Sequence, residues 1–269
     1  MPRCVRRLAC LATVTLFAAV SLAGAPKVGP VPKALGLAPF YEKHLSAGGL
    51  PVVSSAKVPD AALVEAGRLI DRMLEKRPDV RRALIRAKVR VAVMAPDEVT
   101  TDIPEHATLK PKAYWDKRAR GLGATKARPA TSCATENLLG LKGDRYKGES
   151  ILIHEFAHTI HLMALNTVDA MFEKELELLF ARAKEKKLWQ KTYAMTDMGE
   201  YWAEAVQSYF DANLEVAKPN GIHNHVNTRE ELAKYDPALF RLVDRVFRQT
   251  EWRFEGAGTK SAAVTKPAK

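Results

Sequence analysis

The sequence predicts an α+β protein that is mostly helical and contains a small sheet. Valine recurs at every second position in Val89, Val91 and Val93, which predicts a strand. Apolar residues recur at helical spacing in other segments, most clearly between Val168 and Phe180. The expected helices run from Pro59-Asp60 to just before Pro78 and over 79–87, 149–165, 167–187, 198–214 and 236–249, and a second strand is expected near 113–118.

The composition is that of an ordinary globular chain. The 269 residues are 47% hydrophobic and 27% charged, which excludes a collagen, a disordered chain and a disulfide-dense mini-protein. The length suits one core, or a core with a small N-terminal lobe. The net charge of +11 would suit a nucleic acid, but no helix-turn-helix, zinc-finger or basic-aromatic pattern accompanies it. We therefore expect no nucleic acid partner.

Residues 1–25 are expected to be a signal peptide. Three arginines precede the uncharged run 8–22, and Ala23-Gly24-Ala25 is a cleavage pattern of small residues. The run is too short to span a bilayer, although an uncleaved anchor is the alternative. We therefore expect a secreted or periplasmic protein that is not inserted in a membrane after cleavage. Cys133 alone would remain in the mature chain, so no internal disulfide is expected, and no partner histidine for this thiol is evident.

The rest of the chain is expected to form one folded domain between two irregular ends. Residues 26–58 are rich in Pro, Gly and Ala, with weak periodicity, and are predicted to be an extended leader over the surface. The folded domain is expected over 59–255. The tail 256–269 consists largely of Gly, Ala, Thr and Lys and is expected to be disordered.

The most informative motif is His154-Glu155-Phe156-Ala157-His158, an H-E-x-x-H pattern. On a helix, residues four apart lie on one face, so both imidazoles can approach one ion. Two rigid nitrogen ligands suit Zn²⁺. Glu155 stands beside the first ligand, where a carboxylate can take a proton from water held at the metal. The alternative is a pair of core or surface histidines without a metal.

A later helix supplies Glu200 as a third ligand candidate. A catalytic zinc site keeps three protein ligands and leaves the fourth position to water. Glu204 follows one turn later on the same face and can accept a hydrogen bond from the outer nitrogen of a ligating histidine. A solvated acidic face is the alternative, but the aromatic residues of this helix indicate burial, where unpaired carboxylates would be costly.

These motifs, in their order and spacing, resemble the gluzincin metallopeptidases over roughly residues 130–215. The detail resembles the branch typified by anthrax lethal factor and its catalytic-domain relatives. The resemblance implies a zincin-type metallopeptidase domain with a small mixed sheet and an active-site helix. It also implies one Zn²⁺ per chain, held by His154, His158 and Glu200, with Glu155 as general base.

The resemblance extends to the substrate side of the site. In that branch, a tyrosine seven residues before the ligand glutamate donates its phenol to the tetrahedral intermediate, which implies this role for Tyr193. The alternative is a loop aromatic packed on the core. In gluzincins the strand before the metal-binding helix forms the rim of the cleft, which implies that position for residues 135–139. The expected substrate is a peptide or protein, cut as an endopeptidase rather than an exopeptidase.

Three further histidines need an interpretation. His161 continues the metal-binding helix without a glycine break, so we expect a cleft-wall or outer-shell position, with ligation as the alternative. His223 and His225 flank one residue and could bind a second metal, or belong to a loop ordered by hydrogen bonds.

Three other functions stay open at this point. They are a zinc-binding protein without peptidase activity, a surface-interaction protein that binds acidic polymers, and a hydrolase of a non-peptide amide such as a cell-wall bond. The sequence does not specify the oligomeric state or the substrate.

Overall fold

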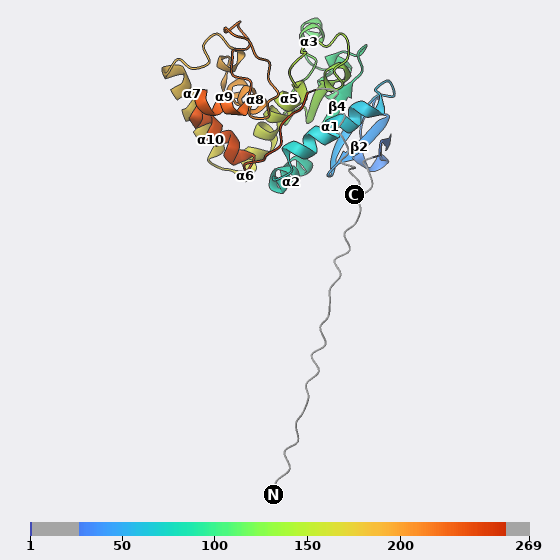
Figure 1. Ribbon diagram of the computed structural model, residues 1–269. Helices are drawn as coiled ribbons and strands as arrows, with labels where there is room; N and C mark the ends of the chain where they lie inside the picture. The colour runs from blue at the N-terminus through green and yellow to red at the C-terminus, as the bar shows by residue number, and fades with distance from the viewer. Residues whose placement is uncertain (2–26, 257–269) are drawn as a thin grey trace, which may run out of the picture.

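The computed structural model describes Met1 and residues 27–256, and it is an α+β protein (Figure 1). All but Met1 of the expected signal peptide and all but Gly256 of the expected tail lie outside these residues. The strands are β1 (Gly29–Pro30), β2 (Lys43–Ala47), β3 (Leu50–Ser54), β4 (Arg90–Met94) and β5 (Ala130–Ala134). The helices are α1 (Asp60–Met73), α2 (Pro78–Arg86), α3 (Lys112–Arg118), α4 (Thr135–Leu138), α5 (Ile151–Ile160), α6 (Asn166–Val168), α7 (Phe172–Glu185), α8 (Met198–Tyr209), α9 (Arg229–Tyr235) and α10 (Pro237–Val246).

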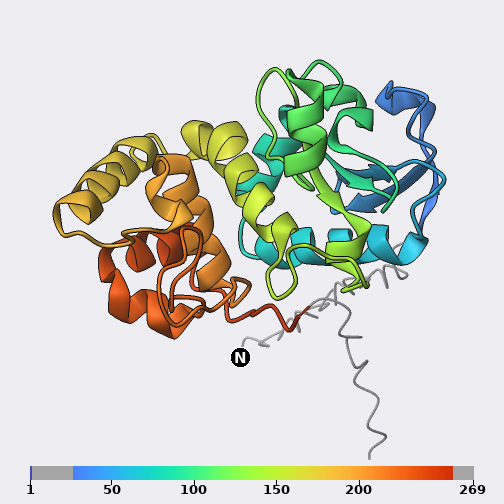
Figure 2. The same cartoon turned by 90° about the horizontal axis from the view of Figure 1, so that it is seen from above.

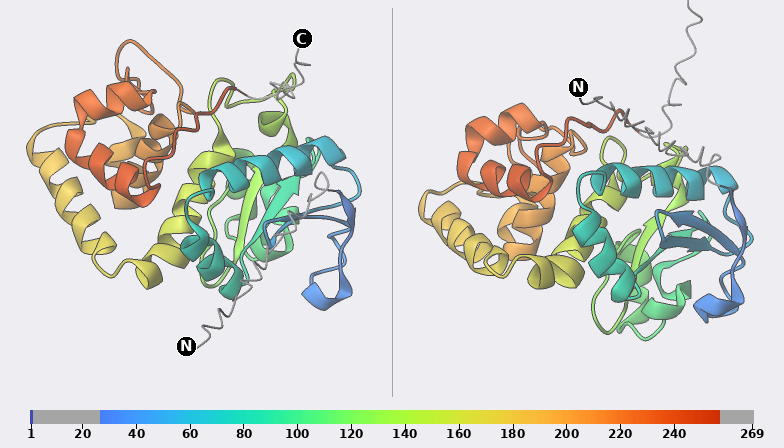
Figure 3. Two further views of the ribbon diagram at one scale, coloured as in Figure 1. Left: turned by 60° about the horizontal axis from the view of Figure 1, so that its bottom comes forward. Right: turned by 90° about the horizontal axis from the view of Figure 1, so that it is seen from below.

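The strands form one mixed sheet in the order β1-β2-β3-β4-β5. β1, β2 and β3 are antiparallel neighbours, whereas β3, β4 and β5 run parallel. Side chains of β4 alternate between two cores: Val91 and Val93 join the larger one, while Ala92 and Met94 join a smaller one on the other face. α1 lies across the sheet on the side of the larger core (Figure 3).

The C-terminal helices gather beside the sheet as a second part of the molecule. α7, α8, α9 and α10 lie together on one side of the molecule, the sheet lies on the other, and α5 runs between them (Figure 2). α8 is docked onto α5 by the indole of Trp202, which donates a hydrogen bond to the carbonyl of Ala157 at 2.9 Å. α5 and α8, which carry the predicted ligands, are therefore packed against each other at the junction of the two parts.

Residues 29–54 contain the strands β1, β2 and β3 of the sheet. They do not form the extended leader that was predicted for 26–58. Leu45, Val52 and Val53 are fully buried, and β2 pairs with β3 through a two-residue turn at Gly48-Gly49. Both glycines have positive φ, of 55° and 93°, as this type of hairpin turn requires. β3 shows no clean alternation because both of its faces are covered.

The other predicted elements agree with the structure to different degrees. The prediction of a strand near 113–118 was wrong, since these residues form α3, where Lys112 pairs with Asp116 one turn later. The helix predicted over 149–165 is α5 followed by a π-helical turn over His161–Leu165. The helices predicted at 167–187, 198–214 and 236–249 are present as the shorter α7, α8 and α10. No helix within residues 27–256 is both long and apolar enough to cross a bilayer.

Candidate metal centre

α5 is a buried helix whose polar face carries the H-E-x-x-H motif. The hydroxyl of Ser150 caps its N-terminus by accepting a hydrogen bond from the amide of Ile153. Leu152, Phe156 and Ile160 are fully buried, so the apolar side of the helix belongs to the core. The two histidines are thereby left to face the other way, towards α8.

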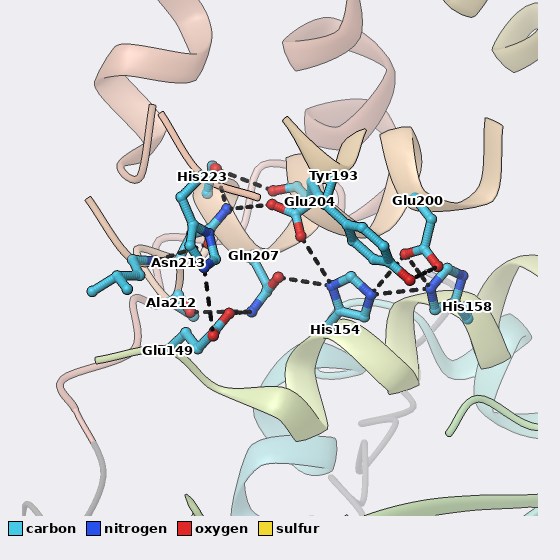
Figure 4. Close-up of polar contacts among 12 residues, drawn as sticks. Glu149, His154, His158, Tyr193, Glu200, Glu204, Gln207, Ala212, Asn213 and His223 are labelled. Atoms are coloured by element: carbon cyan, nitrogen blue, oxygen red, sulfur yellow. Dashed lines mark hydrogen bonds and ion pairs between the residues drawn. The ribbon is translucent and has the colours of Figure 1, made fainter. Parts of the chain in front are cut away.

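The three predicted ligands converge on one point (Figure 4). Nε2 of His154 lies 3.0 Å, and Nε2 of His158 lies 3.1 Å, from Oε2 of Glu200, and the two nitrogens are 3.1 Å apart. Ligands at the usual Zn–N and Zn–O distances of a tetrahedral site lie about 3.3 Å from one another. Within the described residues this is the one group of His, Cys, Asp and Glu side chains with such geometry. The residues therefore fit a tetrahedral metal with one open position.

Glu200 is fixed at the start of α8. The carboxylate of Asp197 caps this helix by accepting a hydrogen bond from the amide of Glu200 at 3.0 Å. Burial raises the pKa of Glu200, but the hydrogen bonds and charges of His154 and His158 together outweigh it and hold the pKa well below its usual range. The carboxylate is therefore ionised, as a metal ligand must be.

The outer nitrogen of His154 is held by Gln207 rather than by Glu204. Nδ1 donates to Oε1 of Gln207 at 2.7 Å, whereas Oε1 of Glu204 lies 3.7 Å away, beyond hydrogen-bond distance. Glu204 instead accepts a hydrogen bond from Asn213 at 2.9 Å. The expected hydrogen bond between Glu204 and a ligating histidine is thus absent. Gln207 lies seven residues after Glu200 on the same helix face, but this spacing alone does not distinguish it from Glu204 as the partner of His154.

Tyr193 lies beside the ligands, as the resemblance implied. Its phenol donates to Oε1 of Glu200 at 2.9 Å and accepts a hydrogen bond from Nη2 of Arg118 at 2.8 Å. Burial and the neighbouring charge of Glu200 raise its pKa, so the phenol is protonated and can act as a donor. Arg118 was not singled out by the sequence reading, because 75 residues separate it from Tyr193.

Glu155 faces the same cavity as the ligands. Burial raises the pKa of its carboxyl group, and a hydrogen bond from the backbone amide of Gly123 acts in the opposite direction. The cavity has a volume of about 420 Å³. Its lining includes the ligands, Glu155, Tyr193, Glu204 and Ile151, together with Glu149, His223 and the segment 118–122.

One rim of the cavity belongs to the segment 119–123, of which residues 119–122 line the cavity. Leu122 and Ser132 exchange two backbone hydrogen bonds, so this segment runs antiparallel along the edge of β5. A Cβ atom on Gly121 would lie 2.5 Å from Ile151, and one on Gly123 would lie 2.7 Å from Cβ of His158. The segment thus packs directly on α5 because both residues lack a side chain.

The prediction that residues 135–139 form the rim of the cleft was wrong. Residues 135–138 form the buried helix α4, and no residue of 135–139 lines the cavity. The α4 residue Asn137 has a structural role, since its side chain accepts a hydrogen bond from the amide of Ile151 at 2.9 Å and so supports the start of α5.

The remaining histidines lie outside the ligand set. Nε2 of His161 hydrogen-bonds to Glu173 at 2.6 Å, and His161 does not line the cavity, so the expected cleft-wall position is not observed. His223 lines the cavity with Nε2 3.7 Å from Glu149, whereas the ring of His225 packs against Tyr235. The two do not share a metal-binding group in the described part of the chain.

Two buried groups outside the ligand set, Glu149 and Cys133, have raised pKa values. Burial, followed by the charge of Glu204, raises the pKa of Glu149 to about 7. Cys133 is fully buried within β5, and burial raises the pKa of its thiol far above the usual range, so the thiol is not a nucleophile.

Comparisons with known proteins support the fold. No protein-family profile matches the sequence, and no curated protein matches it. Among solved structures, the chain is similar to the Pro-Pro endopeptidase PPEP-2 from Paenibacillus alvei, with a TM-score of 0.50 and 19% sequence identity. The chain shares its fold with this endopeptidase. The match covers 72% of this chain and 96% of the other chain, which confirms the predicted α+β fold class.

Proposed function

We propose that the protein is a secreted, zinc-dependent endopeptidase of the gluzincin type, of the branch that resembles anthrax lethal factor. The observation that carries the proposal is the convergence of His154, His158 and Glu200 on one point, beside the phenol of Tyr193. The endopeptidase fold of PPEP-2 supports the class of reaction. Export rests on the pattern of residues 1–25 alone.

The side chains at the site suit hydrolysis of an amide bond. Zinc, when bound by the three ligands, would lower the pKa of a water molecule and polarise the substrate carbonyl. Glu155 would take the proton from the attacking water and pass it to the leaving nitrogen. Tyr193 would turn its phenolic hydrogen from Oε1 of Glu200 to the oxygen of the carbonyl as negative charge develops there.

A closed, purely structural zinc site receives no support from this geometry. Such a site needs a fourth protein ligand. His161 was the candidate, but it pairs with Glu173, and Glu155 faces the cavity without joining the ligand group among the described residues. The open position next to a cavity of about 420 Å³ favours a site that admits a substrate.

The first experiment compares zinc content in the purified chain with that of Glu200→Ala. We expect close to one equivalent in the parent protein and a sharp reduction in the variant, because Glu200 is one of three ligands. Equal zinc in both would remove Glu200 from the ligand set. Absence of zinc from both, after incubation with excess metal, would contradict the proposal.

The second experiment separates metal binding from catalysis. Glu155→Gln should retain zinc yet lose at least about 100-fold in the rate of peptide hydrolysis, because the amide cannot accept the proton. The measurement is mass-spectrometric analysis of a peptide library, with zinc content as the matched control. A Glu155→Gln protein that still cleaves at the parent rate would exclude Glu155 as the base.

A further inference from the structure

Arg118 occupies a distinctive place at the mouth of the cavity. It is the last residue of α3, and its guanidinium lies 2.8 Å from the phenol oxygen of Tyr193, which also lines the cavity. The phenol has one hydrogen, which it donates to Glu200, so Arg118 completes the hydrogen bonding of this oxygen. The three side chains form a chain of hydrogen bonds that ends at a metal ligand.

The backbone around Arg118 is held in place by side chains from other parts of the molecule. Three successive carbonyl groups accept hydrogen bonds: that of Lys117 from Arg145 at 2.7 Å, that of Arg118 from Tyr146 at 3.0 Å, and that of Ala119 from Thr100 at 2.7 Å. These contacts fix the position from which the long arginine side chain extends. A side chain that starts from a fixed backbone loses less entropy when its head group is positioned.

The charge of Arg118 is not used in an ion pair. The neighbouring Arg120 is buried and makes a two-point contact with the carboxylate of Glu136, at 2.6 and 3.0 Å. Within residues 27–256, no carboxylate lies within ion-pair distance of Arg118, and its guanidinium has one hydrogen-bond partner, the phenol oxygen. Arg120 therefore stabilises the fold, whereas Arg118 brings its positive charge to the phenol and, through space, to the carboxylate of Glu200 beyond it.

We propose that Arg118 is a positioning residue for the reaction, which acts through the phenol of Tyr193 on the oxygen that becomes negatively charged. This inference rests on the proposed peptidase function. A hydrogen bond donated to the phenol oxygen polarises the O–H bond and strengthens the phenol as a donor.

The test is a double-mutant cycle in the zinc-loaded, full-length mature protein. Arg118→Gln should lower kcat by about 10- to 100-fold, with KM changed by less than about twofold, because the interaction strengthens in the transition state. In a Tyr193→Phe background, the same substitution should change kcat by less than about threefold, because the phenol hydroxyl through which Arg118 acts is absent. Arg118→Met keeps the apolar stem of the side chain and should behave in the same way.

A second readout does not depend on turnover. A phosphinic peptide imitates the tetrahedral geometry of the intermediate, and calorimetry should show that Arg118→Gln binds it about 10- to 100-fold more weakly. Zinc content and thermal unfolding should match those of the parent protein. Arg86→Gln, the same charge change on the exposed surface of α2, is the control and should alter neither kcat nor binding.

The outcomes discriminate clearly. A parent protein that cleaves peptides, with an Arg118→Gln variant of equal kcat, would overturn the inference and leave the proposed function intact. Effects of Arg118→Gln and Tyr193→Phe that multiply, or a loss confined to KM, would show that Arg118 binds the substrate directly and would overturn it too. A zinc-loaded parent protein that cleaves no peptide would overturn the proposed function and this inference together.

Discussion

The imidazole of His154, a proposed metal ligand, is oriented by the side-chain amide of Gln207. Gln207→Leu should weaken zinc binding by about 10- to 100-fold, because it removes the acceptor that fixes the ring and its tautomer. Glu204→Gln should have a smaller effect, since Glu204 lies 3.7 Å from the same nitrogen. Competition with a chromogenic chelator measures both. Glu177→Gln, on the exposed face of α7, is the control. A larger effect from Glu204→Gln would contradict the structure.

At the scale of residues, the sequence predicted the side chains of the site that lie close to one another along the chain. The two histidines and Glu155 lie within one helical turn, and Glu200 followed from the ligand count that zinc requires. Gln207 and Arg118 could not be found in this way. Their roles depend on how α8 and α3 pack against the rest of the molecule, which no local spacing encodes.

At the scale of elements, the close packing of the segment 119–123 on α5 gives a second prediction. Gly123→Ala should destabilise the protein by about 1–3 kcal/mol, because the new methyl group would lie 2.7 Å from Cβ of His158. It should also reduce activity, since Gly123 donates its amide hydrogen to Glu155. Urea unfolding and peptide cleavage measure the two effects.

A matched control for this substitution is available in β1. Gly29→Ala adds the same methyl group where nothing lies within 4 Å, so stability should change by less than about 0.5 kcal/mol. Equal stability of the two variants would mean that the segment moves away from α5 without cost.

Elements were predicted well where one face alone is buried. α7 and α10 each bury one apolar stripe, so their helical periodicity can be read from the sequence. The first strands were missed because β3 is covered on both faces and shows no alternation. The pair Gly48-Gly49 between two apolar runs was the available signal, since it is typical of a two-residue hairpin turn.

At the scale of the whole molecule, the candidate site lies where the sheet-containing part meets the helical part. α5 packs against β5 on one side and α8 on the other, so correct geometry at the ligands depends on the intact fold. A metal bound by residues from both α5 and α8 would join these layers. Loss of the metal should therefore reduce the global stability as well as the activity.

Acid stability of the whole fold should depend on His106, which lies far along the chain from the ligands. Its ring is 1% exposed, Nε2 lies 3.1 Å from the hydroxyl of Ser132 in β5, and Nδ1 has no partner within the described residues. Burial, followed by the charge of Arg128, lowers the pKa of His106 to about 4. In the unfolded chain the pKa returns to about 6.5.

The unfolded state therefore binds more protons than the folded state between about pH 6.5 and pH 4, and stability falls as the pH decreases through this range. Each pKa unit corresponds to about 1.4 kcal/mol, so His106 should account for a loss of about 2–3 kcal/mol between pH 7.5 and pH 4.5. His106→Gln can still form a hydrogen bond with Ser132. Over the same pH range, its free energy of unfolding, measured with urea, should fall by about 2–3 kcal/mol less than that of the parent protein. The histidines of the candidate metal centre are identical in both proteins, so their contribution cancels in the comparison. An equal loss in both would mean that His106 is protonated in the folded state and that its burial carries no pH dependence.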